Sequence, residues 1–337
     1  MLREVWGWRP RCVLLASTGG GGDPGSALYL ARLMAAEGAR VVMAVLPWER
    51  FVRDPAPGPI PLEAFSGVER LSYTARVIPR LCHALRRGRL LEPSACSVAR
   101  EAPGPVYLLD GWGGVASVER GLMEAGGLHG CDAAAAFDVG GDMLATGGEE
   151  GLWSPLADSL GLAAVASLYR DEGVAVVHSP GSDGELSPGE VLERIAAIAA
   201  RGGYRWARAV SRFEAGMLEE ALRLVHTEAG VPALLAARGR LGPYRLRGGT
   251  RRLDVSILQA FTFFLDARAS AEASVARLVA GSASLDEARE RMNAEGIYTE
   301  LDLEEDISLY AARAGRLPGP GEVAAIREEG RRRLRRG

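Results

Sequence analysis

Four short hydrophobic runs, each followed by a loop rich in glycine and aspartate, constrain the fold more than any other feature of the sequence. The loops read TGGGGD (residues 18–23), DGWGG (110–114), DVGGD (138–142) and PGSDGE (180–185). If the runs are parallel strands of one sheet, all four loops lie at the carboxyl edge of that sheet, where open α/β sheets bind ligands. The sequence therefore predicts a ligand site of acidic character, without naming its reaction.

Strands and helices alternate through the first 201 residues. Residues 11–16 form an apolar run, helical spacing follows as far as Gly38, and residues 40–46 form a second apolar run. This is a βαβ unit, which favours a parallel sheet. Further strands are predicted at 106–109, 132–137 and 174–177, and residues 71–88 are predicted to be helical. We expect residues 1–201 to form a three-layer, doubly wound, mostly parallel Rossmann-like α/β core that holds the glycine-aspartate loops.

Residues 202–337 are predicted to form a mixed α/β elaboration. A helix is expected over 213–228, a hairpin over 244–255 around Gly248 and Gly249, and one more strand over 262–265, before two further helices. This region either extends the same sheet within one domain or covers its edge, and the pattern leaves both arrangements open.

The chain contains no lysine, so all 40 of its basic residues are arginine. A P-loop needs a lysine for its phosphates, Schiff-base enzymes need a lysine amine, and protein kinases need a lysine on their third strand. A G-x-S-x-G elbow is also missing, which argues against a Ser-His-Asp hydrolase. The lysine-dependent mechanisms are excluded in their usual forms.

Charge, hydropathy and cysteine spacing limit the partners, the cellular location and the cysteine sites that the sequence predicts. The net charge of −3 does not favour nucleic-acid binding, and no apolar run is long enough to predict a membrane span. The first residues do not resemble a signal peptide, so we expect a cytoplasmic protein, and a homo-oligomer stays open. The four cysteines lack C-x-x-C spacing, which argues against a zinc ribbon and against a disulfide framework.

The first loop is a candidate phosphate or cofactor site. Gly20, Gly22 and Gly25 satisfy G-x-G-x-x-G after a strand and at the start of a helix, where backbone amides favour phosphate. An NAD site is less well supported, because Asp23 before Pro24 is typical of a helix cap that competes for those amides, and no acid ends the second strand to bind ribose. The residues assigned to this phosphate or nucleotide site are Gly19, Gly20, Gly21, Gly22 and Asp23.

Asp110 and Gly111 in the second loop are assigned to the same binding site. They would offer a substrate a carboxylate and a flexible backbone. The alternative is a simple turn, because Asp-Gly is a common turn pair.

The third and fourth loops supply carboxylates that no helix needs as caps. Asp138 and Asp142 lie well before the next helix, which we expect to start at residues 154–155, and the capping box at residues 187–190 leaves Asp183 and Glu185 spare. Carboxylates on glycine loops suit a hard cation, so Asp138, Asp142 and Asp183 are predicted to bind Mg²⁺ or Mn²⁺. Glu185 or His178 is the predicted general base, although for His178 alone the pattern favours a buried structural histidine.

Three of these motifs, TGGGGD, FDVGGD and PGSDGELSP, occur in this order along the chain. In them the sequence resembles an archaeal and actinobacterial family that is known only as a domain of unknown function. The resemblance covers most of the chain and implies that the three loops form one site. It implies no activity and no catalytic residues.

The sequence therefore favours a divalent-cation-dependent hydrolase or group transferase that acts on a phosphorylated or nucleotide-like anionic small molecule. The arginines on either side of Gly248 and Gly249 are candidates to balance the charge of a phosphate, namely those at 245, 247, 251 and 252. One alternative is an NAD(P)-dependent oxidoreductase that uses the glycines of the first loop. Another is a nucleotide-binding or sugar-binding module without catalysis.

Overall fold

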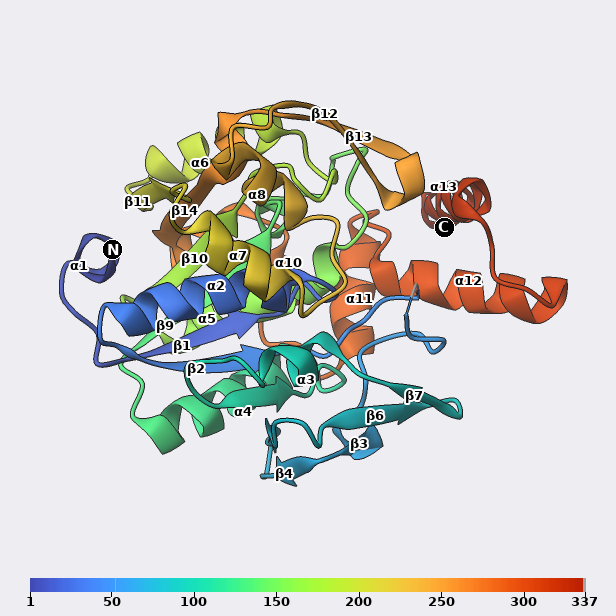
Figure 1. Ribbon diagram of the computed structural model, residues 1–337. Helices are drawn as coiled ribbons and strands as arrows, with labels where there is room; N and C mark the ends of the chain where they lie inside the picture. The colour runs from blue at the N-terminus through green and yellow to red at the C-terminus, as the bar shows by residue number, and fades with distance from the viewer. Residues whose placement is uncertain (52, 336–337) are drawn as a thin grey trace.

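A nine-stranded sheet forms the centre of the computed structural model, which describes residues 1–51 and 53–335. Its strand order is β11-β14-β10-β9-β1-β2-β8-β5-β4, and Figure 1 shows the twisted central strands. The five central strands are parallel: β10 (Gly173–His178), β9 (Ala133–Val139), β1 (Cys12–Ser17), β2 (Arg40–Val45) and β8 (Val106–Leu109). Antiparallel strands extend both sides: β14 (Phe261–Asp266), β11 (Tyr204–Ala209), β5 (Thr74–Val77) and β4 (Val68–Arg70).

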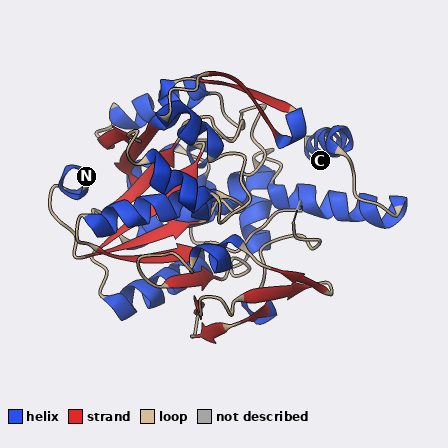
Figure 2. Ribbon diagram, in the orientation of Figure 1, coloured by secondary structure: helices blue, strands red, loops and turns tan. Residues whose placement is uncertain are grey.

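Two helical layers cover the sheet, so the predicted three-layer α/β architecture is confirmed (Figure 2). Successive side chains of β1 pack on opposite faces: Leu14 and Ala16 into one core, Val13 and Leu15 into the other. Strands buried on both faces become continuous apolar runs, which is why the sequence reveals them. The first face is covered by α4 (Gly114–His129), α5 (Pro155–Leu168), α6 (Pro188–Ala199), α9 (Ala267–Ala273), α10 (Ala276–Val279) and α11 (Leu285–Ala294). The second face is covered by α1 (Leu2–Trp6), α2 (Asp23–Ala36), α3 (Ser94–Val98), α7 (Ala215–Leu222) and α8 (Val231–Ala237).

The prediction of a helix over residues 71–88 is wrong. This segment contributes β5 to the main sheet and β6 (His83–Arg86) to a small second sheet with β3 (Phe65–Ser66) and β7 (Arg89–Leu91). Ala75 and Val77 are buried and Arg76 between them is exposed, which is the two-residue period of a strand. Pro79 follows and would interrupt a helix.

The C-terminal region both extends the sheet and covers its carboxyl edge. Strands β11 and β14 join the main sheet, and the hairpin of β12 (Gly242–Leu246) and β13 (Arg251–Val255) forms where a hairpin was predicted. The last helices are α12 (Glu300–Ala314), which contacts α5, and α13 (Pro320–Leu334). Figure 1 shows the hairpin extending toward α13.

The strand order places a topological switch point between β1 and β9. From β1 the chain passes through α2 to β2 on one side, whereas β8 leads through α4 to β9 on the other side. Helices α2 and α4 lie on opposite faces, so the chain diverges above the carboxyl ends of these two strands. A crevice of this kind is the usual ligand position in doubly wound sheets.

The prediction against disulfides is also wrong. The structure joins Cys12 to Cys131 and Cys82 to Cys96, which leaves none of the four cysteines free. The partners are 119 and 14 residues apart, so only the fold brings them together. Among the described residues, we find no helix that combines the length and apolarity needed to cross a bilayer.

These pairings predict the thiol content of the protein. Titration of the unfolded, unreduced chain is expected to detect no reactive thiol, and four after reduction, because both bonds survive unfolding without reductant. Reduction should also lower the melting temperature, because the unfolded chain gains freedom. Two or more thiols before reduction would contradict at least one of the pairings.

Candidate functional site

Six buried carboxylates gather at the carboxyl edge of the sheet in two groups of three. In each group, oxygens of the three side chains lie within 4.8 Å of one another. We call Asp23, Asp138 and Asp158 the first trio, and Asp142, Asp183 and Glu185 the second trio. None of the six residues is more than 8% exposed. Such burial is rare for acidic residues unless their charges are compensated.

Loops after β9 and β10 and the starts of two helices position the trios. Asp138 lies at the end of β9, and Asp142 follows two glycines with positive φ, Gly140 at 119° and Gly141 at 104°. A Cβ on Gly140 would lie 2.3 Å from Cγ of Asp183, so only glycine allows this loop to pack against the next one. The third and fourth loops predicted from the sequence are therefore in contact.

The first trio takes one residue from each of two helix starts. Asp158 lies in the first turn of α5, and Asp23 is the first residue of α2. The cap of α2 is Gly22, so the expectation that Asp23 serves as the helix cap is wrong. Its carboxylate belongs to the trio.

Burial and mutual proximity raise the pKa of five of the six carboxyl groups. Burial, and then the neighbouring carboxylates, raise the pKa of Asp23, Asp142, Asp158 and Asp183 well above the usual range. Burial raises the pKa of Asp138 to about 7. Without a compensating cation, the two trios cannot all be ionised at neutral pH.

Several oxygens of the trios have no hydrogen-bond partner among the described residues. They are Oδ1 of Asp138, Oδ1 of Asp158 and Oδ2 of Asp183, each buried. A buried acceptor without a donor costs free energy, so native proteins satisfy such atoms with protein groups, water or ions. The carboxylate oxygens are the ligand type that Mg²⁺, Mn²⁺ and Ca²⁺ prefer, so the residues present fit a hard cation.

Glu185 differs from the other five carboxylates. It accepts hydrogen bonds from Ser154 Oγ at 2.6 Å and from the amides of Trp153 and Ser154 at 2.6 and 2.8 Å, and it pairs with Arg247 at 2.5 Å. Although burial opposes ionisation, Arg247 and Arg251 lower the pKa of Glu185 to about 2. The side chain is thus held as a carboxylate, which suits a cation ligand better than a general base.

Three arginines surround Trp153 next to the second trio. The guanidinium carbons of Arg247, Arg251 and Arg327 lie 5.7, 4.9 and 4.9 Å from the centroid of its ring, within cation-π range. Arg251 donates to the carbonyls of Gly151 and Gly184, and Arg327 donates to those of Glu150 and Leu152. Of the four arginines proposed from the sequence, Arg247 and Arg251 belong to this group around Trp153. Arg245 and Arg252 are exposed on the hairpin and are not among the arginines over this ring.

The first loop, residues 18–23, is held in place by the segment that follows β2. Arg50 Nη2 donates to the carbonyl of Gly19 at 2.6 Å, and the amide of Gly21 donates to the carbonyl of Trp48 at 3.0 Å. A Cβ on Gly19 would lie 2.3 Å from Asp23 Oδ2 and 2.6 Å from Asp158 Oδ1. The lack of a side chain at Gly19 therefore keeps space beside the first trio.

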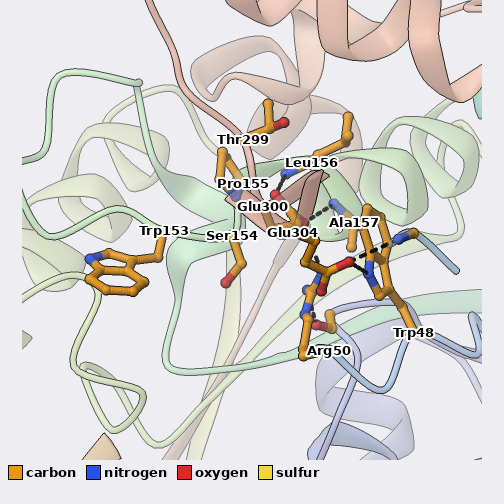
Figure 3. A network of polar contacts seen from close by, with 12 residues as sticks. Trp48, Arg50, Trp153, Ser154, Pro155, Leu156, Ala157, Thr299, Glu300 and Glu304 are labelled. Carbon is orange, nitrogen blue, oxygen red and sulfur yellow. Dashed lines mark hydrogen bonds and ion pairs between the residues drawn. The ribbon is translucent and has the colours of Figure 1, made fainter. Parts of the chain in front are cut away.

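Glu300 and Glu304 of α12 connect the C-terminal region to this site (Figure 3). The Glu300 carboxylate accepts from the amides of Leu156 and Ala157 at 3.0 and 2.9 Å and pairs with Arg50 at 3.3 Å. It therefore caps α5, the helix that bears Asp158, in place of Ser154. Glu304 accepts from Trp48 Nε1 at 2.9 Å and from the amide of Gly58 at 2.8 Å.

Other residues proposed from the sequence lie outside the trios. His178 is 1% exposed, its Nδ1 is 2.8 Å from Thr262 Oγ1, and burial lowers its pKa to about 4, with no carboxylate contributing to the shift. Asp110 accepts from the Trp112 amide at 2.9 Å and from Ser117 Oγ at 2.8 Å, which is the geometry of a turn at the start of α4. A Cβ on Gly111 would lie 2.8 Å from Leu46 Cδ1, so this glycine packs against the core.

Sequence reasoning missed Asp158, Glu300 and Arg327. An acid in the first turn of a helix, such as Asp158, is ordinarily explained by the helix dipole. Glu300 and Glu304, one turn apart beside buried leucines at 301 and 303, offered a weak signal, because acids on an apolar helix face need buried partners.

Fold and site together define a doubly wound α/β protein with a buried acidic centre at its topological switch point. Residues 14–308 match the model of the family described as "Protein of unknown function (DUF1152)", so the chain belongs to that family. The resemblance to a domain of unknown function is confirmed. No curated protein and no solved structure matches the chain.

Proposed function

We propose that this protein is a divalent-cation-dependent enzyme that catalyses hydrolysis or group transfer on a phosphorylated or nucleotide-like small molecule. The observation that carries the proposal is the set of buried carboxylates with partnerless oxygens at the switch point. Six acids gathered without equal positive charge are costly to the fold, and function is the usual reason for such a cost.

The second trio would hold the cation. Glu185 is kept ionised by Arg247, and Oδ2 of Asp183 has no protein partner among the described residues. Asp142 completes the trio, and Asp138 lies at the end of β9, just before the loop that holds Asp142. When bound, Mg²⁺ or Mn²⁺ would polarise a phosphoryl or carbonyl oxygen and acidify water.

Arg247 is the guanidinium best placed to meet an anionic substrate. Its side chain is 39% exposed, whereas Arg251 and Arg327 are committed to backbone carbonyls. Arginine binds phosphate through a planar pair of donors, which suits a chain without lysine. Arg247 would orient the substrate, and Arg251 and Arg327 would shape the loop that presents Trp153.

Thermal unfolding with and without Mn²⁺ tests the cation site. At a concentration 100 times its dissociation constant, Mn²⁺ is expected to stabilise the folded protein by about 2.7 kcal/mol. Asp183→Asn should lose this stabilisation, yet without metal it should be at least as stable as the original chain, because one charge leaves a crowded cluster. Asp132→Asn, at the opposite end of β9, should keep the effect of Mn²⁺.

A panel of phosphatase, nucleotidase and kinase substrates then tests the reaction. We expect Mn²⁺-dependent turnover of at least one substrate and its loss in Asp183→Asn. Stabilisation by NAD without a metal effect would instead support an oxidoreductase, which the carboxylate of Asp23 at the start of α2 disfavours. Binding without turnover would support the non-catalytic module.

The proposed location is the cytoplasm, where phosphorylated metabolites and Mg²⁺ are abundant. The two disulfides restrict this proposal. Intracellular disulfides persist mainly in hyperthermophiles, so a cytoplasmic location requires that setting.

A further inference from the structure

We propose that the first trio binds a second divalent cation, so that the centre holds two cations, one in each trio. This inference rests on the proposed function, in which the second trio binds the first cation. It adds Asp23 and Asp158 as ligands and assigns Asp138 to the new position.

The balance of charge favours a cation at the first trio even more than at the second. In the second trio, Glu185 forms an ion pair with Arg247. In the described part of the chain, no arginine forms an ion pair with Asp23, Asp138 or Asp158. Arg50 is the nearby guanidinium that contacts the first loop, but it donates to the Gly19 carbonyl and pairs with Glu300 rather than with Asp23 or Asp158.

The free oxygens of the first trio give independent support. Oδ2 of Asp138 accepts from the Met143 amide at 3.2 Å, whereas its Oδ1 and Oδ1 of Asp158 have no partner among the described residues. Asp138 and Asp158 are only 1% and 2% exposed, so bulk water does not replace the missing donors. Asp138 and Asp158 each have a buried carboxylate oxygen without a donor, and each offers a carboxylate oxygen within 4.8 Å of one from the other, which suits a shared cation.

Gly19 provides the space that such a cation needs. A Cβ at this position would meet a carboxylate oxygen of both Asp23 and Asp158. The φ of Gly19 is not in the left-handed region, so the backbone itself does not require glycine. Glycine is required at position 19 because the carboxylate oxygens of Asp23 and Asp158 leave no room for a Cβ.

The loop between β9 and α5 joins the two trios. Asp138 belongs to the first trio and Asp142 to the second, and only three residues separate them in the chain. Adjacent cation positions clamp the attacking and leaving oxygens in phosphoryl transfer. The inferred substrate class is therefore a phosphate ester or anhydride.

Mn²⁺ binding to the full chain tests the inference without an activity assay. After equilibrium dialysis, we expect two Mn²⁺ per chain by elemental analysis, and an electron paramagnetic resonance spectrum of a spin-coupled pair. Asp158→Asn and Asp183→Asn should each bind one Mn²⁺ and show the six-line spectrum of an isolated ion. Asp132→Asn should bind two.

Gly19→Ala is the second variant, because it retains all six carboxylates and fills the space beside Asp23 and Asp158. It should also bind one Mn²⁺ with the isolated-ion spectrum, and its circular dichroism should match that of the original chain. One Mn²⁺ in the original chain, lost in Asp183→Asn and retained in Asp158→Asn and Gly19→Ala, would overturn the second site and leave the proposed function standing. No bound Mn²⁺ would overturn both.

Discussion

Replacement of Glu300 by alanine is expected to lower the free energy of unfolding by about 3–5 kcal/mol, the usual cost of removing one partner from a buried ion pair. The carboxylate is the partner of Arg50 and of two amides at the start of α5. Its loss would leave a mostly buried guanidinium and two uncapped amides. Urea unfolding monitored by circular dichroism measures the change.

Glu305→Ala on the same helix is the matched control. The Glu305 side chain is 49% exposed and pairs with Arg289 at the surface, so its loss should cost no more than about 1 kcal/mol. Equal losses in the two variants would contradict the role of Glu300 as the anchor of α5. We also expect Glu300→Ala to weaken Mn²⁺ binding, because α5 positions Asp158.

Glu304→Gln is expected to remove a pH dependence of stability on the order of 3 kcal/mol. Burial raises the pKa of Glu304 from its ordinary value of 4.5 to about 7. A carboxyl group with a raised pKa favours the folded state fully below pH 4.5, and this contribution is lost as the pH rises through about 7. The original chain should therefore lose stability relative to Glu304→Gln over that interval.

Urea unfolding of both proteins between pH 4 and 8 measures this difference. Glutamine retains one oxygen for Trp48 and Gly58, so the two proteins should be of similar stability at the acidic end. Parallel stability curves across the whole range would show that Glu304 ionises normally in the folded protein. The comparison cancels the titration of groups that the two proteins share.

The parts of the fold that could be predicted are those set by local pattern. Strand β1 is apolar from Cys12 to Ala16 because it is buried on both faces. Helix α6 begins at Pro188 because Ser187 and Glu190 complete a capping box. The local pattern gave a wrong prediction at β5, because the arginine-rich segment around this short strand resembled a helix. Whether that strand forms depends on pairing with β8, which is about 30 residues away.

The candidate site was partly predictable for a related reason. Asp142, Asp183 and Glu185 stood out because no helix needed them as caps, and the structure brings these three together. Asp158 and Asp23 escaped notice or were misassigned, because an acid at a helix start already has an ordinary local explanation. Glu300 lies 144 residues from Leu156, whose amide it binds, and nothing in local sequence connects them.

The sequence by itself determined the layered α/β core, the common edge of its loops and the exclusion of lysine-dependent chemistry, because periodicity, glycine placement and residue inventory are local properties. Only the tertiary structure decided which carboxylates meet, that they divide into two trios, and that α12 and α13 hold the loops around them. The physical reason is that charge compensation acts through space. A carboxylate needs a cation only where folding has taken it from water and placed it beside others of its kind.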